Sequence, residues 1–298
     1  MSRFAYYPGC SATGTSIEYD ASTRAICEQL GIGLQEIPGW SCCGSTPAHA
    51  VDPVLSAALS ARNIMQAGTM GLDTITTPCP SCLKNLRSTR QKLQDDAFRA
   101  KVERLVDGAI PTDIPIVSVL QIIFEHIGAQ GLKDRTTKPL TGLKLAPYYG
   151  CMLSRPKELM NFGDPENPMS LDILMPALGA EIVPFPLKTE CCGASLGVTR
   201  RGVVTRLSGR ILDVAESMGA DAIVTACPLC QMNLDMRQGQ INRDNNTRHN
   251  MPVFYYSQLI GLALGLDDAA LGLDKLYVPP FKLLDRIGPK AADAKATA

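Results

Sequence analysis

The chain has 298 residues, of which 45% are hydrophobic and 19% charged, and its 29 Lys and Arg balance its 29 Asp and Glu. This composition is that of a globular protein with one large or two ordinary domains, and it excludes a disordered or fibrous chain. The zero net charge argues against nucleic acid or an anionic membrane as a partner held by bulk electrostatics. The N-terminal segment lacks the apolar stretch of a signal peptide, and no run approaches the roughly 18 apolar residues of a membrane span. We therefore expect a cytoplasmic protein that is not integral to a membrane.

Strands and helices alternate through the first half of the chain. The apolar runs and the helical spacing of apolar residues predict strands at 4–7, 32–37 and 72–77, and helices at 15–30, 54–71, 82–93 and from 115–117 to Gly128.

The second half repeats the same order. The predicted elements are strands at 143–149, 181–185 and 222–226, and helices at 170–179, 203–218 and from 252–254 to Gly265. Alternation of this kind predicts an α/β fold with two pseudo-symmetric repeats, each a small, mostly parallel sheet flanked by helices. The expected units are 1–130, 141–266 and a C-terminal extension at 267–298, whose polar tail begins at Lys282.

Ten of the eleven cysteines fall into two sets of five with matching spacing. The first set is Cys10, Cys42, Cys43, Cys79 and Cys82, and the second is Cys151, Cys191, Cys192, Cys227 and Cys230. In each set the cysteines follow the ends of three predicted strands. Because ligands of parallel sheets gather beyond the carboxyl ends of the strands, we expect the five thiols of each set to meet there.

Thiolates are soft ligands that select zinc, copper(I) or iron–sulfur clusters. In a reducing compartment, metal ligation is also a better explanation of eleven cysteines than a disulfide framework. A structural zinc or a cubane cluster takes four ligands and would leave one cysteine of each set unexplained. Five thiols with an adjacent pair therefore suggest an iron–sulfur cluster of unusual shape, although a zinc-bearing interaction module remains an alternative.

The motifs resemble those of the heterodisulfide reductase B subunits, a family with a duplicated cysteine-rich CCG domain. The matching stretches are Tyr6-Tyr7-Pro8-Gly9-Cys10, Ser41-Cys42-Cys43-Gly44, Thr77-Pro78-Cys79-Pro80-Ser81-Cys82, Tyr149-Gly150-Cys151, Glu190-Cys191-Cys192-Gly193 and Ala226-Cys227-Pro228-Leu229-Cys230. The resemblance implies that each five-cysteine set is the metal site of one noncubane [4Fe-4S] cluster. It also implies a catalytic role, that of an oxidoreductase which cleaves or forms a small-molecule disulfide between the two clusters.

The resemblance also implies partners. The chain shows no GxGxxG motif in a strand–turn–helix setting and no spare cysteine sets for relay clusters, so we expect its electrons to come from other subunits. Electrons would then pass through two partners, a ferredoxin-like C subunit of heterodisulfide reductase and its flavin-containing A subunit. Methanogen members often carry His around the first cysteine of the second set, where this chain has Tyr148 and Met152. An electron-relay or sulfur-oxidation subunit that does not use coenzymes M and B as substrate is therefore an open alternative.

A few other side chains are candidates for roles near the metal sites. His49 follows the first adjacent pair and is a candidate catalytic proton donor. Lys188 is expected to be solvated or to offer a charge to an acidic substrate, and Trp40 and Tyr7 are expected to shield the first cluster. The side chains expected to be structural or solvated are Cys27, His126 and His249.

Overall fold

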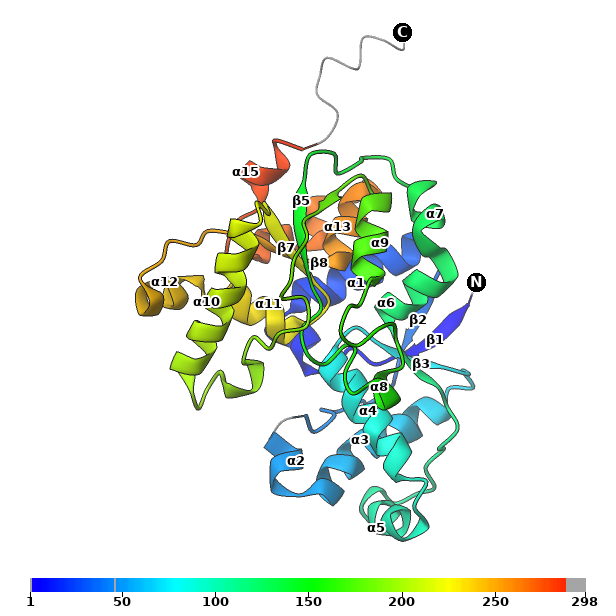
Figure 1. Cartoon of the computed structure of the whole chain (residues 1–298). Coiled ribbons are helices and arrows are strands. Elements are labelled where there is room, and N and C mark those ends of the chain that lie inside the picture. Colours follow the sequence, from blue (N-terminus) through cyan, green and yellow to red (C-terminus); the bar gives the residue numbers. More distant parts are fainter. Residues whose placement is uncertain (1, 46, 288–298) are drawn as a thin grey trace.

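The computed structural model describes residues 2–45 and 47–287 (Figure 1). These residues form two four-stranded sheets in which every neighbouring pair of strands is parallel. The strand orders are β2-β1-β3-β4 and β6-β5-β7-β8, so the second half repeats the topology of the first. The structure thus confirms the predicted α/β fold of two repeats with parallel sheets.

The first repeat runs from the N-terminus to α7. Its strands are β1 (Arg3–Tyr6), β2 (Gly33–Glu36), β3 (Ile75–Thr77) and β4 (Ile116–Ser118). Its helices are α1 (Ile17–Gln29), α2 (Pro47–Val51), α3 (Pro53–Gly68), α4 (Pro80–Lys92), α5 (Asp96–Val106), α6 (Val119–Ile122) and α7 (Gly128–Lys133), with the short turn η1 at Cys10–Thr13 and a π-helix, η2, at Ile123–Ile127.

The second repeat and the C-terminal extension follow. The strands are β5 (Lys144–Tyr148), β6 (Glu181–Ile182), β7 (Ala222–Thr225) and β8 (Val253–Tyr255). The helices are α8 (Lys157–Met160), α9 (Ser170–Ala177), α10 (Arg201–Ser217), α11 (Pro228–Leu234), α12 (Gln238–Asn245), α13 (Tyr256–Ala263), α14 (Asp268–Leu271) and α15 (Phe281–Leu284), with short turns at Ala194–Leu196 (η3) and Leu273–Lys275 (η4).

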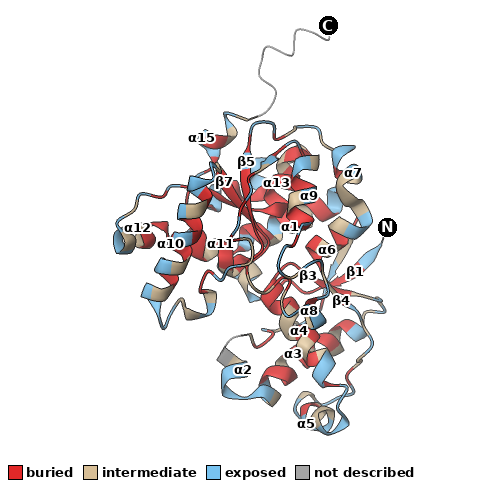
Figure 2. Cartoon of the chain, in the orientation of Figure 1, coloured by how far each residue is buried: buried red, intermediate tan, exposed pale blue. Residues whose placement is uncertain are grey.

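The buried apolar side chains form one central core and two outer cores. Each outer core contains three cysteines of one repeat's set; the first also includes Met160 of the second repeat, and the second consists of residues of the second repeat alone. The central core combines residues of both repeats, among them Tyr6 and Ile26 from the first and Leu145 and Phe254 from the second. Figure 2 shows buried residues gathered where α1, α13 and the sheets meet. The two repeats therefore share the central core.

Two short strands differ from the sequence expectation. Residues 116–118 and 253–255 form β4 and β8, where we predicted only the start of a helix. The helix that follows β4 passes into the π-helix, which ends at Gly128 with a φ of 67° and a ψ of 178°, and a separate helix, α7, then extends to Lys133. Each repeat thus has four strands rather than three.

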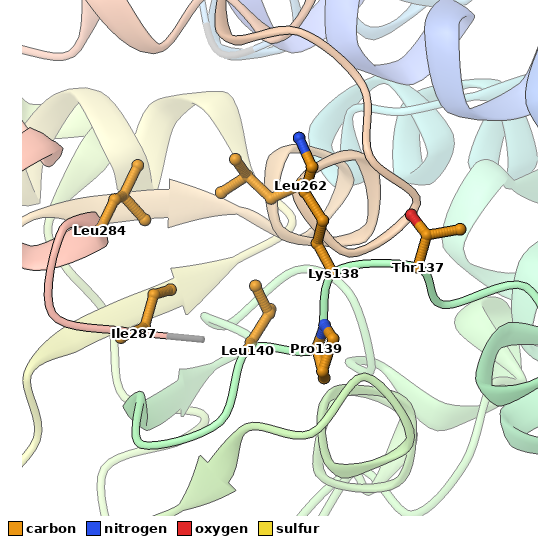
Figure 3. A pocket seen from close by; sticks show the side chains of 7 residues that line it. All are labelled: Thr137, Lys138, Pro139, Leu140, Leu262, Leu284 and Ile287. Carbon is orange, nitrogen blue, oxygen red and sulfur yellow. The ribbon is translucent and has the colours of Figure 1, made fainter. Parts of the chain in front are cut away.

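The C-terminal extension packs against the body of the protein. Leu283, within the segment predicted as a polar tail, is only 6% exposed, and Ile287 packs against the central core. The tail prediction therefore began too early, and residues 288–298 lie outside the described part of the chain. A surface pocket at this end contains none of the ten motif cysteines (Figure 3); its lining is Thr137, Lys138, Pro139, Leu140, Leu262, Leu284 and Ile287. No helix among the described residues is both long and apolar enough to cross a membrane.

Candidate metal centres

The first cysteine set lies at the carboxyl edge of the first sheet. Cys10 begins the turn that follows β1, and the adjacent cysteines Cys42 and Cys43 lie in the loop after β2. Cys79 is the N-cap of α4 directly after β3, which places Cys82 in the first turn of that helix. Because β2, β1 and β3 are neighbours in one parallel sheet, their loops converge at the same edge.

The second set has the same placement on the second sheet. Cys151 follows β5, and the pair Cys191 and Cys192 lies in the loop after β6. Cys227 is the N-cap of α11 after β7, and Cys230 lies in the first turn of that helix. The structure thus brings thiols from three separate loops to one edge in each repeat.

Sulfur–sulfur contacts connect the loops within each set. The Sγ atoms of Cys43 and Cys82 lie 3.6 Å apart, and those of their counterparts Cys192 and Cys230 are also 3.6 Å apart. The Sγ atoms of Cys151 and Cys191 are 3.9 Å apart. These contacts are pairwise: no three His, Cys, Asp or Glu side chains among the described residues are arranged as a site for a single metal ion.

Burial divides each set in the same way. Three thiols are buried in each repeat, namely Cys43, Cys79 and Cys82 in the first and Cys192, Cys227 and Cys230 in the second. The remaining two face solvent more openly: Cys10 and Cys42 are exposed, Cys191 is exposed, and Cys151 is partly exposed. Each set therefore has a buried base and an open side, and the open side is where a small molecule can approach.

An asparagine contacts the buried member of each adjacent pair. The Nδ2 group of Asn85 lies 3.8 Å from Cys43 Sγ, and that of Asn233 lies 3.6 Å from Cys192 Sγ. Both asparagines come from the helix that carries the last cysteine of the set. An amide N–H directed at sulfur stabilises the thiolate, which is the metal-binding form.

A serine holds the backbone at the same position. Ser60 donates to the carbonyl oxygen of Cys43 at 2.8 Å, and Ser208 donates to that of Cys192 at 3.1 Å. Ser60 and Ser208 are fully buried on α3 and α10, which follow the adjacent-cysteine loops in the two repeats. These serines were not identified from the sequence, because nothing in their local pattern shows what they contact.

A buried tyrosine lies beneath each set. The hydroxyl of Tyr7 donates to the carbonyl oxygen of Ser41 at 2.7 Å, and that of Tyr148 donates to the carbonyl of Glu190, also at 2.7 Å. Each acceptor is the residue before the adjacent pair. Trp40 packs edge-on against Tyr7, with ring centroids 5.6 Å apart. Tyr7 lies in the same buried core as three cysteines of the first set, and Trp40 packs against that core. Their shielding of the first cluster stays a prediction.

The hydrogen bonds between thiols shift their pKa values in opposite directions. Hydrogen bonds from Cys42 and then Cys82 lower the pKa of the Cys43 thiol, and a hydrogen bond from Cys230 lowers that of Cys192. The donors respond inversely: the pKa values of Cys82 and Cys230 are raised, first because each donates to that thiolate. In each set these hydrogen bonds thus favour the thiolate form of the buried member of the adjacent pair.

Two glycines leave room for sulfur. A Cβ atom on Gly9 would lie 2.9 Å from Cys82 Sγ, and one on Gly150 would lie 2.9 Å from Cys230 Sγ. Both residues also adopt left-handed φ angles, 78° and 67°. The soft thiolates are suitable ligands for a metal group, and the absence of a side chain at Gly9 and Gly150 leaves space beside one sulfur of each set.

The other candidate residues have different outcomes. Lys188 is not solvated: its Nζ atom lies 2.6 Å from Asp172 Oδ1, and its side chain is 15% exposed. Asp172 also accepts a 2.6 Å hydrogen bond from Tyr149, the residue two positions before Cys151. This network was not predicted, because the burial of Lys188 depends on distant segments. His49 is exposed on α2 and lines a surface pocket with Asn85, and its catalytic role stays a prediction.

The residues expected to be structural have packing or ionic partners. Cys27 is fully buried in the central core, as predicted. His126 packs edge-on against Phe4. His249 is 5% exposed, and its ring nitrogens lie 2.8 Å from a Glu216 oxygen and 3.2 Å from an Asp213 oxygen.

Comparison with known proteins agrees with this duplicated site. The cysteine-rich CCG domain family matches residues 4–87 and 145–235. The chain is 36% identical over 286 residues to the 8-methylmenaquinol:fumarate reductase membrane anchor subunit of Wolinella succinogenes, covering 94% of this chain and 98% of that protein. It is 32% identical over 298 residues to the B subunit of ferredoxin:CoB-CoM heterodisulfide reductase from Methanosarcina mazei, covering 96% and 97%.

One solved structure shares the fold. A protein of Helicobacter pylori described as hypothetical superposes with a TM-score of 0.76 over 93% of this chain. The match covers 52% of that protein's chain, at 14% sequence identity. This likeness supports the α/β architecture alone.

Proposed function

Because the chain belongs to the cysteine-rich CCG domain family and is similar to heterodisulfide reductase B subunits throughout its length, we propose that it cleaves or forms a small-molecule disulfide at two noncubane [4Fe-4S] clusters. The family relationship indicates iron–sulfur cluster binding in general. The number and form of the clusters, and the disulfide reaction, are part of the proposal.

One observation carries the proposal: the same five-thiol arrangement is built twice, with the same three thiols buried in each copy. In each copy the buried thiols would hold a metal group against the sheet edge, and the open side would receive the substrate. A single structural ion needs four ligands closed around one point. The pairwise sulfur contacts and the fifth thiol favour a group with several metal atoms.

The duplication matches the electron count of the reaction. When bound, an iron–sulfur cluster supplies or accepts one electron at a time. Breaking a disulfide into two thiols takes up two electrons and two protons, one of each per sulfur, and the reverse reaction releases them. Two sites in one chain therefore supply the pair of electrons that one disulfide needs. The more exposed thiols of each set mark where each substrate sulfur approaches.

The chain requires an external source or acceptor of electrons. All ten motif cysteines belong to the two sets, and the sequence shows no GxGxxG motif in a strand–turn–helix setting. Several relatives are named as subunits, so a complex is the expected assembly. We propose that electrons travel through a ferredoxin-like C subunit of heterodisulfide reductase, linked to its flavin-containing A subunit.

A second candidate is supported by the Wolinella relative, whose name describes part of a fumarate reductase. In this alternative the chain passes electrons between partner proteins and has no disulfide substrate of its own. The two candidates differ in whether a thiol or a disulfide acts directly at the metal sites.

The test begins with anaerobic purification and measurement of iron and labile sulfide per chain. Cys43→Ser should reduce loading of the first site, and Cys192→Ser should reduce loading of the second, because the harder serine oxygen is a poor substitute for thiolate. Cys27→Ser is the control, since Cys27 is buried in the central core and belongs to neither set.

The two candidates are then separated by paramagnetic resonance. Addition of a small thiol or heterodisulfide should change the spectrum of the loaded chain if the disulfide proposal is correct. An unchanged spectrum, with turnover only between partner proteins, would favour electron transfer alone. Zinc without labile sulfide would refute both cluster proposals.

A further inference from the structure

The hydroxyl of one buried tyrosine contacts the backbone directly before a cysteine of each set. Tyr19 on α1 places its hydroxyl oxygen 3.0 Å from the carbonyl oxygen of Pro78 and 2.8 Å from that of Ala226. These two carbonyls belong to the residues directly before Cys79 and Cys227. A single O–H group thus donates a bifurcated hydrogen bond to the backbone of both repeats.

The two contacted positions are equivalent in the duplicated fold. Cys79 is the N-cap of α4 and Cys227 is the N-cap of α11, and each helix carries the next cysteine of its set in its first turn. The tyrosine itself comes from only one repeat. The contacts of Tyr19 therefore have no equivalent in the second repeat. They connect two cysteine sets that are formed by different segments of the chain.

The ring of Tyr19 is held on two sides. It stacks on Tyr255 with ring centroids 4.0 Å apart and planes 4° apart, and it meets Tyr256 edge-on at 6.1 Å. Tyr19 is 2% exposed, and both neighbours are fully buried in the central core. Because water does not compete in this interior and the ring has little freedom to turn, the position of the hydroxyl is fixed.

We propose that Tyr19 is a positioning residue that couples the two cysteine sets by fixing the turns of Cys79 and Cys227 relative to each other. Its hydroxyl completes a short hydrogen-bonded route between the sets, which runs from Cys79 through the Pro78 carbonyl, the tyrosine oxygen and the Ala226 carbonyl to Cys227. A displacement at one set is transmitted to the other through this one atom. The two sites then act as a pair of fixed geometry.

Tyr19→Phe isolates the role of the hydroxyl, because phenylalanine keeps the ring stack. Thr23→Val is the matched control: it removes a fully buried hydroxyl from the same helix, and that hydroxyl has no hydrogen-bond partner among the described residues. Hydrogen exchange of the anaerobically purified full chain reports on both turns. The amides of Leu83 and Gln231 donate to the carbonyls of Cys79 and Cys227 at 2.9 and 3.0 Å, and they exchange when those turns open.

We expect Tyr19→Phe to speed exchange in both turns by about tenfold, equivalent to about 1.4 kcal/mol, with no change in a peptide from α10. Paramagnetic resonance of the loaded chain should show both metal signals altered together. Thr23→Val should change neither measurement. Unchanged exchange in Tyr19→Phe, acceleration in one turn only, or equal acceleration in α10 would overturn the proposal. Since exchange is measured without reference to metal type, this result is separate from that of the cluster assay.

Discussion

Gly9→Ala tests whether the fold reserves space for sulfur at the first proposed metal site. Gly9 connects β1 to Cys10 and has a φ of 78°, a conformation in which a side chain is strained. An added Cβ would lie 2.9 Å from the Sγ atom of Cys82. The substitution therefore introduces two separate effects, one on the backbone and one on the thiol.

The two effects have different sizes and consequences. Gly9 combines its φ with a ψ of 161°, a backbone region almost exclusive to glycine. An alanine there costs about 1–3 kcal/mol, which a domain with a typical stability of about 5–15 kcal/mol tolerates. Carbon and sulfur normally approach no closer than about 3.5–4.0 Å, so the thiol must move by about 1 Å. Functional groups in a site need to be held within about 0.5 Å. We therefore expect Gly9→Ala to fold but to load the first site poorly.

The assay is iron and labile sulfide per chain, together with the free energy of unfolding. Gly71→Ala is the control, because Gly71 also has a positive φ, 63°, but an added Cβ there meets nothing within 4 Å. Both variants should lose similar stability, and only Gly9→Ala should lose metal. Gly150→Ala should reproduce the effect at the second site. Equal metal content in Gly9→Ala and Gly71→Ala would refute the reasoning.

Three further predictions concern the surroundings of the sites. Ser60→Ala and Ser208→Ala each remove a buried hydrogen bond to an adjacent-pair carbonyl and should each lower the free energy of unfolding in denaturant by about 1 kcal/mol; no change in either would contradict the assigned contacts. Lys188→Met leaves the buried Asp172 carboxylate without its cation and should lower the free energy of unfolding by about 3 kcal/mol in the same assay. A loss below about 1 kcal/mol would contradict this, because it is the size expected of a solvent-exposed salt bridge. Burial raises the pKa of the Asp235 carboxyl to about 6, so the folded state holds its proton more tightly than the unfolded chain does. The free energy of unfolding should therefore fall by up to about 3 kcal/mol as the pH rises from about 4 to about 6, and Asp235→Asn should flatten this part of the stability profile.

The sequence was sufficient for the repeat, for the alternation of strands and helices, and for the position of the cysteines after the strands. These features are local: Pro8-Gly9 ends a strand, and Cys79-Pro80 begins a helix, wherever the segments lie in space. The carboxyl-edge rule then brings the ten cysteines to two places without further information.

Features that depend on distant partners were not predictable. Strands β4 and β8 are three residues long and run directly into apolar helices, so their periodicity could not be separated from that of the helix. The burial of Lys188 depends on Asp172, and the role of Tyr19 depends on a carbonyl 207 positions away. Such contacts are set by tertiary packing, which a single sequence does not show.

The central core has the reciprocity of a two-fold dimer interface. Helix α1, the first long helix of the first repeat, packs against α13, the last helix of the second repeat. Reciprocally, α9 at the start of the second repeat packs against α7 at the end of the first. An isologous interface pairs surfaces in this way: patch i meets patch j, and patch j meets patch i.

The single chain therefore has the arrangement of a dimer whose two halves are joined covalently. Because the halves belong to one chain, they can differ at equivalent positions, as they do at Tyr19. A symmetric homodimer would carry this tyrosine twice, whereas here a single hydroxyl is shared by both halves.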